Sequence, residues 1–148
     1  MNGRVSGDSM SMPEISEMFP CPRILVVEDE KIIAMDIRYT LKSMGFFDTT
    51  VVSSGEESIA AAARQNPDLV LMDINLRGEM DGVSAAEHIH SRLGIPIIFL
   101  TAFGDQKTLG RINRMRRFGF LNKPYTDQDL QAMIRETLRK FPPGQSSN

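Results

Sequence analysis

Residues 23–30 read Arg-Ile-Leu-Val-Val-Glu-Asp-Glu, in which a short run of β-branched and aliphatic residues is followed by three acidic residues. An apolar run without polar alternation is typical of a strand buried on both faces. Similar short runs occur at residues 49–53, 69–72, 96–100 and 118–122. We therefore predict five strands, and the first of them ends at a group of carboxylates.

Apolar residues with helical spacing separate these runs and follow the last one. Gly45 ends the helical pattern of residues 30–44, whose stripe is formed by Ile32, Ile33, Met35, Asp36, Ile37 and Leu41. The predicted helices cover residues 30–44, 55–65, 82–93, 105–116 and 127–140, the last with Thr126 as its N-cap. Strands that alternate with helices predict an α/β fold, a five-stranded parallel sheet with helices on both faces.

Composition limits the classes of protein that remain. The chain has 148 residues, of which 41% are hydrophobic, enough for one domain core. Seventeen Lys and Arg against nineteen Asp and Glu give a net charge of −2, so no overall basic field attracts nucleic acid. The single cysteine, Cys21, excludes an intramolecular disulfide, which fits a reducing, cytoplasmic compartment.

The two ends of the chain differ from its middle. Residues 1–20 are rich in Met, Gly, Pro and Ser without a sustained period, and residues 141–148 contain two prolines and a glycine. We expect a flexible arm, a domain over residues 21–140 and a flexible tail. The longest apolar run, residues 95–100, is too short to span a bilayer, and residues 1–19 lack the apolar centre of a secretory signal.

Polar residues stand directly after four of the predicted strands. The first strand ends in Glu28 and Asp29, the third in Asp73, the fourth in Thr101 and the fifth in Lys123. In parallel sheets these ends meet at one edge, where ligands bind. Clustered carboxylates repel one another unless a cation compensates them, and oxygen ligands without His or Cys suit Mg²⁺. A carboxylate beside Mg²⁺ and Lys is what an aspartyl-phosphate intermediate needs.

Each residue also has a simpler explanation when it is taken alone. Asp29 could cap the first helix, Thr101 could be a turn hydroxyl, and Lys123 with Pro124 could form a surface turn. The combination is more informative, because all of these residues fall at the same edge of the predicted sheet.

Five motifs together give the chain a specific resemblance to the receiver domain of two-component response regulators, over about residues 23–140. The resemblance implies a flavodoxin-like, doubly wound (βα)5 fold. The motifs are ILVVEDE at 24–30, LVLMDINL at 69–76, MDG at 80–82, IPIIFLTA at 95–102 and FLNKPY at 120–125.

The resemblance implies a role for each residue of the phosphorylation site. Asp73 resembles the phosphoacceptor, and Glu28 and Asp29 the acidic pair that holds Mg²⁺ with Asp73. Asn75 matches the position whose backbone carbonyl completes the metal site. Lys123 resembles the paired ammonium, and its bond to Pro124 is cis in many family members.

Further positions match those that act as the switch in the family and those that set the lifetime of its phosphoryl group. Thr101, with Ala102 after it, resembles the switch hydroxyl that turns toward the phosphoryl group, and Phe120 falls at the switch aromatic. Asn75 and Phe103 occupy positions that tune hydrolysis, and Phe103 could shield the phosphoryl group from water.

One loop departs from the family pattern. Between Asp73 and Gly82 the chain is one residue longer than the commonest family loop and lacks its usual proline. We expect Gly78 to accommodate the extra residue.

The resemblance also indicates the partners. A histidine kinase or a phosphotransfer protein would supply the phosphoryl group, and the chain would be a signalling phosphoacceptor rather than an enzyme. About eight residues follow the last predicted helix, so we expect no output domain in this chain. A protein partner or a second copy would then bind the fourth helix, fifth strand and fifth helix, where Arg111, Arg114 and Arg117 lie. The simpler interpretation of these arginines is a solvated helix face.

Three other functions fit the residues less well. A hydrolase of the haloacid-dehalogenase type usually has Asp-x-Asp after its first strand, whereas Asp73 follows the third and Asn75 stands two residues later. A flavin-binding module needs a phosphate-binding loop after the first strand, where residues 28–30 would repel phosphate. A receiver that switches without phosphate is disfavoured by the complete residue set.

Overall fold

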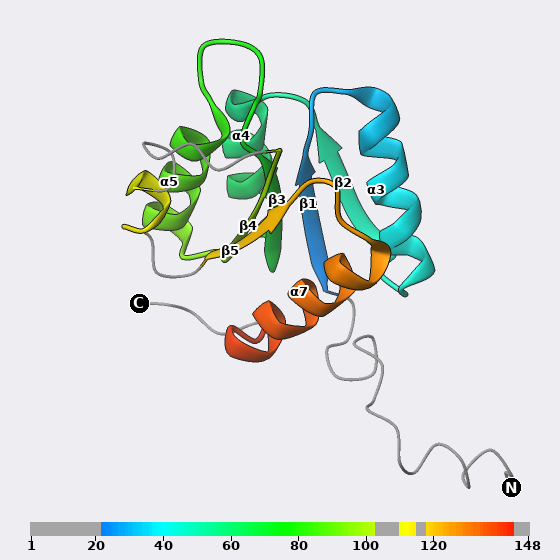
Figure 1. Ribbon diagram of the computed structural model, residues 1–148. Coiled ribbons are helices and arrows are strands. Elements are labelled where there is room, and N and C mark those ends of the chain that lie inside the picture. Colours follow the sequence, from blue (N-terminus) through cyan, green and yellow to red (C-terminus); the bar gives the residue numbers. More distant parts are fainter. Residues whose placement is uncertain (1–21, 103–109, 115–117, 144–148) are drawn as a thin grey trace, which may run out of the picture.

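In the computed structural model, five parallel strands form a single sheet in the order β2-β1-β3-β4-β5 (Figure 1). This order confirms the predicted flavodoxin-like, doubly wound arrangement. The structure describes residues 22–102, 110–114 and 118–143. The elements are β1 (Arg23–Val27), α3 (Lys31–Ser43), β2 (Asp48–Val52), α4 (Gly55–Gln65), β3 (Leu69–Asp73), α5 (Gly82–Leu93), β4 (Ile97–Thr101), β5 (Phe118–Asn122) and α7 (Asp127–Lys140).

Helices cover both faces of the sheet, as predicted. Alternate residues of each strand face opposite sides, so Leu25 and Val27 join one core cluster and Ile24 and Val26 the other. The first cluster is closed by α4, α5 and Ile112, and the second by α3 and α7 (Figure 1). The central strand β3 is buried along its whole length. The sheet is therefore a rigid frame whose edge positions the site.

The observed boundaries agree closely with the sequence pattern. The helices α4, α5 and α7 begin and end at the predicted residues, and Thr126 caps α7 in a reciprocal capping box with Asp129. Of the helix predicted over 105–116, residues 110–112 are described and helical. Residues 113–114 form a turn, and the other residues of that predicted helix lie outside the described residues. The arm predicted over residues 1–20 lies outside them as well. None of the helices in the described ranges is long and apolar enough to span a bilayer.

The apolar stripe predicted on α3 is partly wrong. Ala34, Ile37 and Leu41 are buried against the sheet, whereas Ile32 and Met35 point to solvent. At about 100° per residue, Ile32 and Met35 lie roughly 140–160° around the helix from Ile37. The helix therefore has a second apolar stripe on its outer face, which the linear pattern did not separate from the first.

Candidate functional site

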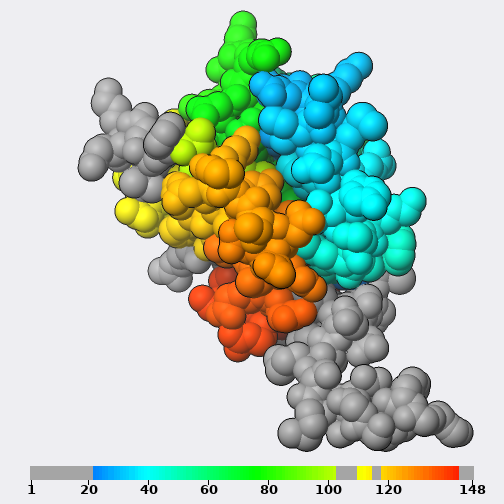
Figure 2. Space-filling model, turned by 45° about the vertical axis from the view of Figure 1, so that its right-hand side comes forward, coloured from blue at the N-terminus to red at the C-terminus, as the bar shows by residue number. Residues whose placement is uncertain are grey.

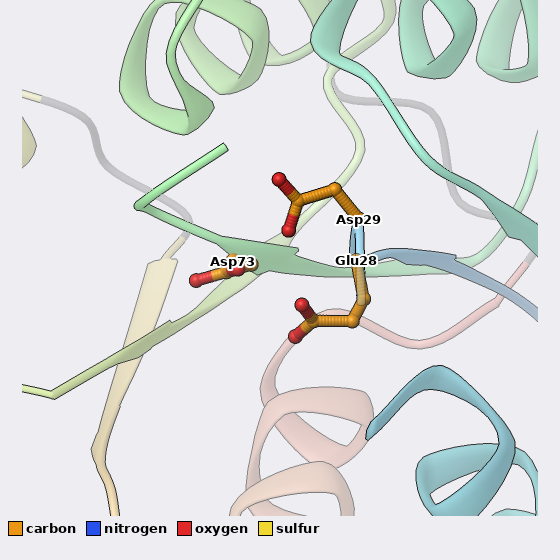
Figure 3. Close-up of side chains that lie close together, drawn as sticks. All are labelled: Glu28, Asp29 and Asp73. Atoms are coloured by element: carbon orange, nitrogen blue, oxygen red, sulfur yellow. The ribbon is translucent and has the colours of Figure 1, made fainter. Parts of the chain in front are cut away.

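The carboxylates that follow β1 and the one that ends β3 come together at the carboxyl edge of the sheet (Figure 3). Parallel pairing places Val27 beside Met72, so Glu28 and Asp73 follow as neighbours. Glu28, Asp29 and Asp73 each offer an oxygen within 4.8 Å of the others. The predicted convergence of these three side chains is present in the structure.

Glu28 is the most unusual carboxylate of the site. Its residue is 2% exposed. Oε2 accepts a hydrogen bond from the Glu30 backbone N–H at 3.2 Å, whereas Oε1 has no hydrogen-bond partner among the described atoms. Burial, and then the charge of Asp73, raise the pKa of Glu28 to about 7. A buried oxygen without a donor, beside two other carboxylates, fits a hard divalent cation such as Mg²⁺.

Asp29 links the end of β1 to the loop that follows β3. Its Oδ2 accepts a hydrogen bond from the Arg77 backbone N–H at 2.9 Å and lies 3.7 Å from the Arg77 Nε. The N-cap position of α3 belongs to Glu30, and no side chain caps it. Asp29 therefore does not cap this helix, and it remains at the carboxylate cluster.

Lys123 is the cation that two buried carboxylates share. Its Nζ lies 3.6 Å from Asp73 Oδ1 and 3.7 Å from Glu28 Oε1. Its backbone N–H donates to the Thr101 carbonyl at 2.7 Å, which joins the ends of β5 and β4, and the bond to Pro124 is cis. Thr101 is buried at the end of β4. All the strand-end residues predicted for the site thus lie on one rim.

Lys123→Gln is expected to lower the free energy of unfolding in EDTA by about 1–3 kcal/mol, because two buried carboxylates lose their cation. Lys140→Gln is the matched control, since Lys140 pairs with the exposed Glu136 at 3.6 Å and should contribute less than about 1 kcal/mol. Urea unfolding in EDTA measures both effects. Equal losses in the two variants would contradict this electrostatic role of Lys123.

The loop between β3 and α5 is shaped by two glycines. Gly78 has a φ of 103°, which fits its predicted role in the longer loop. A Cβ on Gly82 would lie 2.1 Å from the Asp73 carbonyl oxygen. The Asn75 backbone N–H donates to Asp73 Oδ1 at 3.2 Å. The start of α5 therefore packs directly against the backbone of Asp73, and only glycine allows that approach.

Gly82→Ala is expected to destabilise the protein by about 1–3 kcal/mol or more, because the backbone of Asp73 must move away from the added methyl group. Gly110→Ala is the control, since a Cβ there would meet no atom within 4 Å. Thermal unfolding compares the two variants. A Gly82→Ala protein as stable as the Gly110→Ala protein would contradict the close packing.

Arg111 has a role inside the chain that the sequence did not reveal. Its guanidinium lies 3.0 Å from Asp81 Oδ2 and donates to the Ser84 hydroxyl at 2.7 Å. Asp81 is also the N-cap of α5. Of the arginines predicted for a partner surface, Arg111 is therefore engaged by α5, Arg114 is exposed, and Arg117 lies outside the described residues. Asp81 and Arg111 are thirty residues apart, so no local pattern could have paired them.

The other predicted positions are placed as follows. Ala102 is exposed directly after Thr101, and Asn75 is exposed two residues after Asp73. Phe120 is partly buried and packs against the core cluster below α4 and α5. Phe103 lies outside the described residues. The rim thus brings together three carboxylates, one ammonium and one hydroxyl.

Comparisons with known proteins agree with this geometry. The family model described as the response regulator receiver domain matches residues 24–135. The chain is 33% identical over 119 residues to the transcriptional regulatory protein PdtaR of Mycobacterium tuberculosis, which covers 80% of this chain and 58% of PdtaR. It is 33% identical over 118 residues to the DNA-binding response regulator MtrA of the same species, with 80% of this chain and 51% of MtrA covered.

The chain thus spans between half and three-fifths of these curated relatives. Among solved structures, the signal receiver domain of a modulated diguanylate cyclase from Desulfovibrio desulfuricans superposes with a TM-score of 0.72 at 35% identity. That match covers 81% of this chain and 95% of the other.

Proposed function

Because the chain belongs to the response regulator receiver domain family of two-component signalling, we propose that Asp73 accepts a phosphoryl group from a histidine kinase or a phosphotransfer protein. The observation that carries this proposal is the buried Asp73 with Glu28, Asp29 and Lys123 around it. This set has a nucleophile, a place for a divalent cation and a fixed ammonium. Phosphoryl transfer requires little more than these.

In the proposed reaction, a carboxylate oxygen of Asp73 attacks phosphorus while the bond from phosphorus to the donor breaks, and the donor leaves with that electron pair. Mg²⁺ held by Glu28, Asp29, Asp73 and the Asn75 carbonyl would neutralise the phosphoryl oxygens. Lys123 keeps its position near Asp73 and pairs with the added negative charge. The chain is then a signalling phosphoacceptor with self-phosphorylation and autodephosphorylation as its only chemistry.

The phosphoryl group would be sensed through β4 and β5. Thr101 donates its hydroxyl to a phosphoryl oxygen beside Ala102, and Phe120 moves with it, so phosphorylation favours one of two surface states. Phe120 has no hydroxyl, and readout therefore depends on its packing. Asn75 and Phe103 would set the lifetime of the acyl phosphate by controlling the access of water.

The output in this proposal is the binding of a protein in the cytoplasm. The partner would dock on β5, α7 and the stretch before β5 to which Arg114 and Arg117 belong, or a second copy of the chain would dock there. Arg111 contributes less, because Asp81 already holds it. Nucleic acid is not the proposed ligand, since the chain carries a net charge of −2.

The test of this function is intact-mass analysis after incubation with acetyl phosphate and Mg²⁺. We expect one added phosphoryl group, absent when EDTA is present. If the acyl phosphate is hydrolysed too fast for an adduct to accumulate, we expect Mg²⁺-dependent release of inorganic phosphate instead of the adduct. A folded protein that shows neither the adduct nor phosphate release would contradict the proposed function.

A further inference from the structure

The outer face of α3 carries an apolar patch. Ile32 is 83%, Met35 69%, Tyr39 74% and Phe47 74% exposed, and these are four of the five large exposed hydrophobics in the described residues. The first three recur at helical spacing on α3, and Phe47 directly precedes β2. This face is coloured blue to cyan in Figure 2, beside α7. Met35, Tyr39 and Phe47 line one groove, and exposed apolar side chains gathered in this way mark an interaction site.

A groove runs between α3 and the start of β2. Its volume is about 450 Å³, within the range of about 300–1,000 Å³ that binding pockets occupy. Arg38 is fixed at the groove because its Nη2 donates to the Thr49 carbonyl at 3.1 Å. In the described part of the chain, neither Arg38 nor Lys42 forms an ion pair. The main lining residues are Met35, Arg38, Tyr39, Lys42, Phe46 and Phe47.

We propose that the chain's own residues 8–20 dock into this groove. This segment reads DSMSMPEISEMFP, with three acidic residues, no basic residue and five apolar side chains. Ile15, Met18 and Phe19 have the i, i+3, i+4 spacing that places side chains on one face of a helical turn. Glu14 and Glu17 stand among them, so the segment matches the groove in both apolarity and charge.

The connection to the domain favours this segment over a second copy. Arg23 of β1 pairs with Asp48 of β2, and Phe47 of the groove directly precedes Asp48. Neighbouring strands are about 4.8 Å apart, so the segment joins the domain beside the groove. Extended chain from Arg23 reaches about 14 Å to Phe19 and about 28 Å to Ile15. A tether this short gives an effective concentration of about millimolar, well above that of a second copy in dilute solution.

The experiment uses the full chain with the substitutions Cys21→Ser and Ser16→Cys, so that a nitroxide label at position 16 is the only one. Relaxation enhancement of backbone amides in ¹⁵N-labelled protein reports which residues lie near the label. We expect strong broadening at residues 35–42 and 46–49 and little at α5, which lies on the other face of the sheet.

Charge substitutions make the test specific. Arg38→Glu with Lys42→Glu should remove most of the broadening, and adding Glu14→Arg with Glu17→Arg should restore it, which a loss of fold would not permit. Mixing ¹⁵N-labelled protein without nitroxide and unlabelled protein with nitroxide detects docking between copies. Broadening at the groove in that mixture would overturn docking within one chain, as would broadening spread over the surface or absent from the groove.

Discussion

Asp73→Asn is expected to abolish phosphoryl uptake from acetyl phosphate. The amide has nearly the same shape as the carboxylate, but its oxygen is uncharged and a far weaker nucleophile. The fold should persist, because the variant relieves repulsion between position 73 and the buried Glu28. Its free energy of unfolding in EDTA should therefore equal or exceed that of the wild type. Loss of uptake would then report chemistry and not unfolding.

Intact-mass analysis and urea unfolding on the same samples measure both quantities. Asp36→Asn is the matched control, because Asp36 is an exposed aspartate on α3 and its substitution changes the net charge equally. The control should take up one phosphoryl group, as the wild type does. A Mg²⁺-dependent adduct on Asp73→Asn would assign the acceptor to another carboxylate, which peptide mapping would identify.

Mg²⁺ is expected to stabilise the wild type, and Glu28→Gln with Asp29→Asn should remove this response. A cation at a hundred times its dissociation constant adds about 2.7 kcal/mol to the free energy of unfolding. The acidic pair supplies two of the three clustered carboxylates, and Glu28 Oε1 has no described hydrogen-bond donor. Without both side chains the cation has Asp73 as its only remaining charged ligand in the cluster, so binding should be lost.

The same variant should be more stable than the wild type in EDTA. The pKa of Glu28 is raised from 4.5 to about 7, so at pH 8 the folded state holds a carboxylate that it disfavours relative to the unfolded chain. A neutral side chain removes that cost, which we expect to be about 1–3 kcal/mol. The variant would thus gain stability in EDTA and lose the response to Mg²⁺.

Thermal and urea unfolding with Mg²⁺ or EDTA measure both parts of this prediction. Glu56→Gln with Asp36→Asn is the control, because it removes the same charge from exposed positions on α4 and α3. The control should keep the Mg²⁺ response of the wild type. A double variant of the acidic pair that still responds to Mg²⁺ would place the cation elsewhere on the chain.

The architecture and the rim of the site could be predicted from the sequence alone. Strand-forming runs and helical stripes are local patterns, so the alternation could be read without contacts, and α4, α5 and α7 have the predicted bounds. A parallel sheet gathers the carboxyl ends of its strands at one edge, so Glu28, Asp73 and Lys123 could be placed together from their positions after strands.

The side of each helix or strand that meets a given partner could not be predicted from the sequence and became known from the packing. Ile32 and Met35 belong to the apolar stripe predicted for residues 30–44, but the sheet contacts one side of α3 and leaves them exposed. The sequence indicated that Arg111 lies on a partner surface or a solvated helix face, but the packing of its segment against α5 brings it to Asp81. These outcomes depend on how elements far apart in the chain are oriented against each other, and local periodicity carries no information about that orientation.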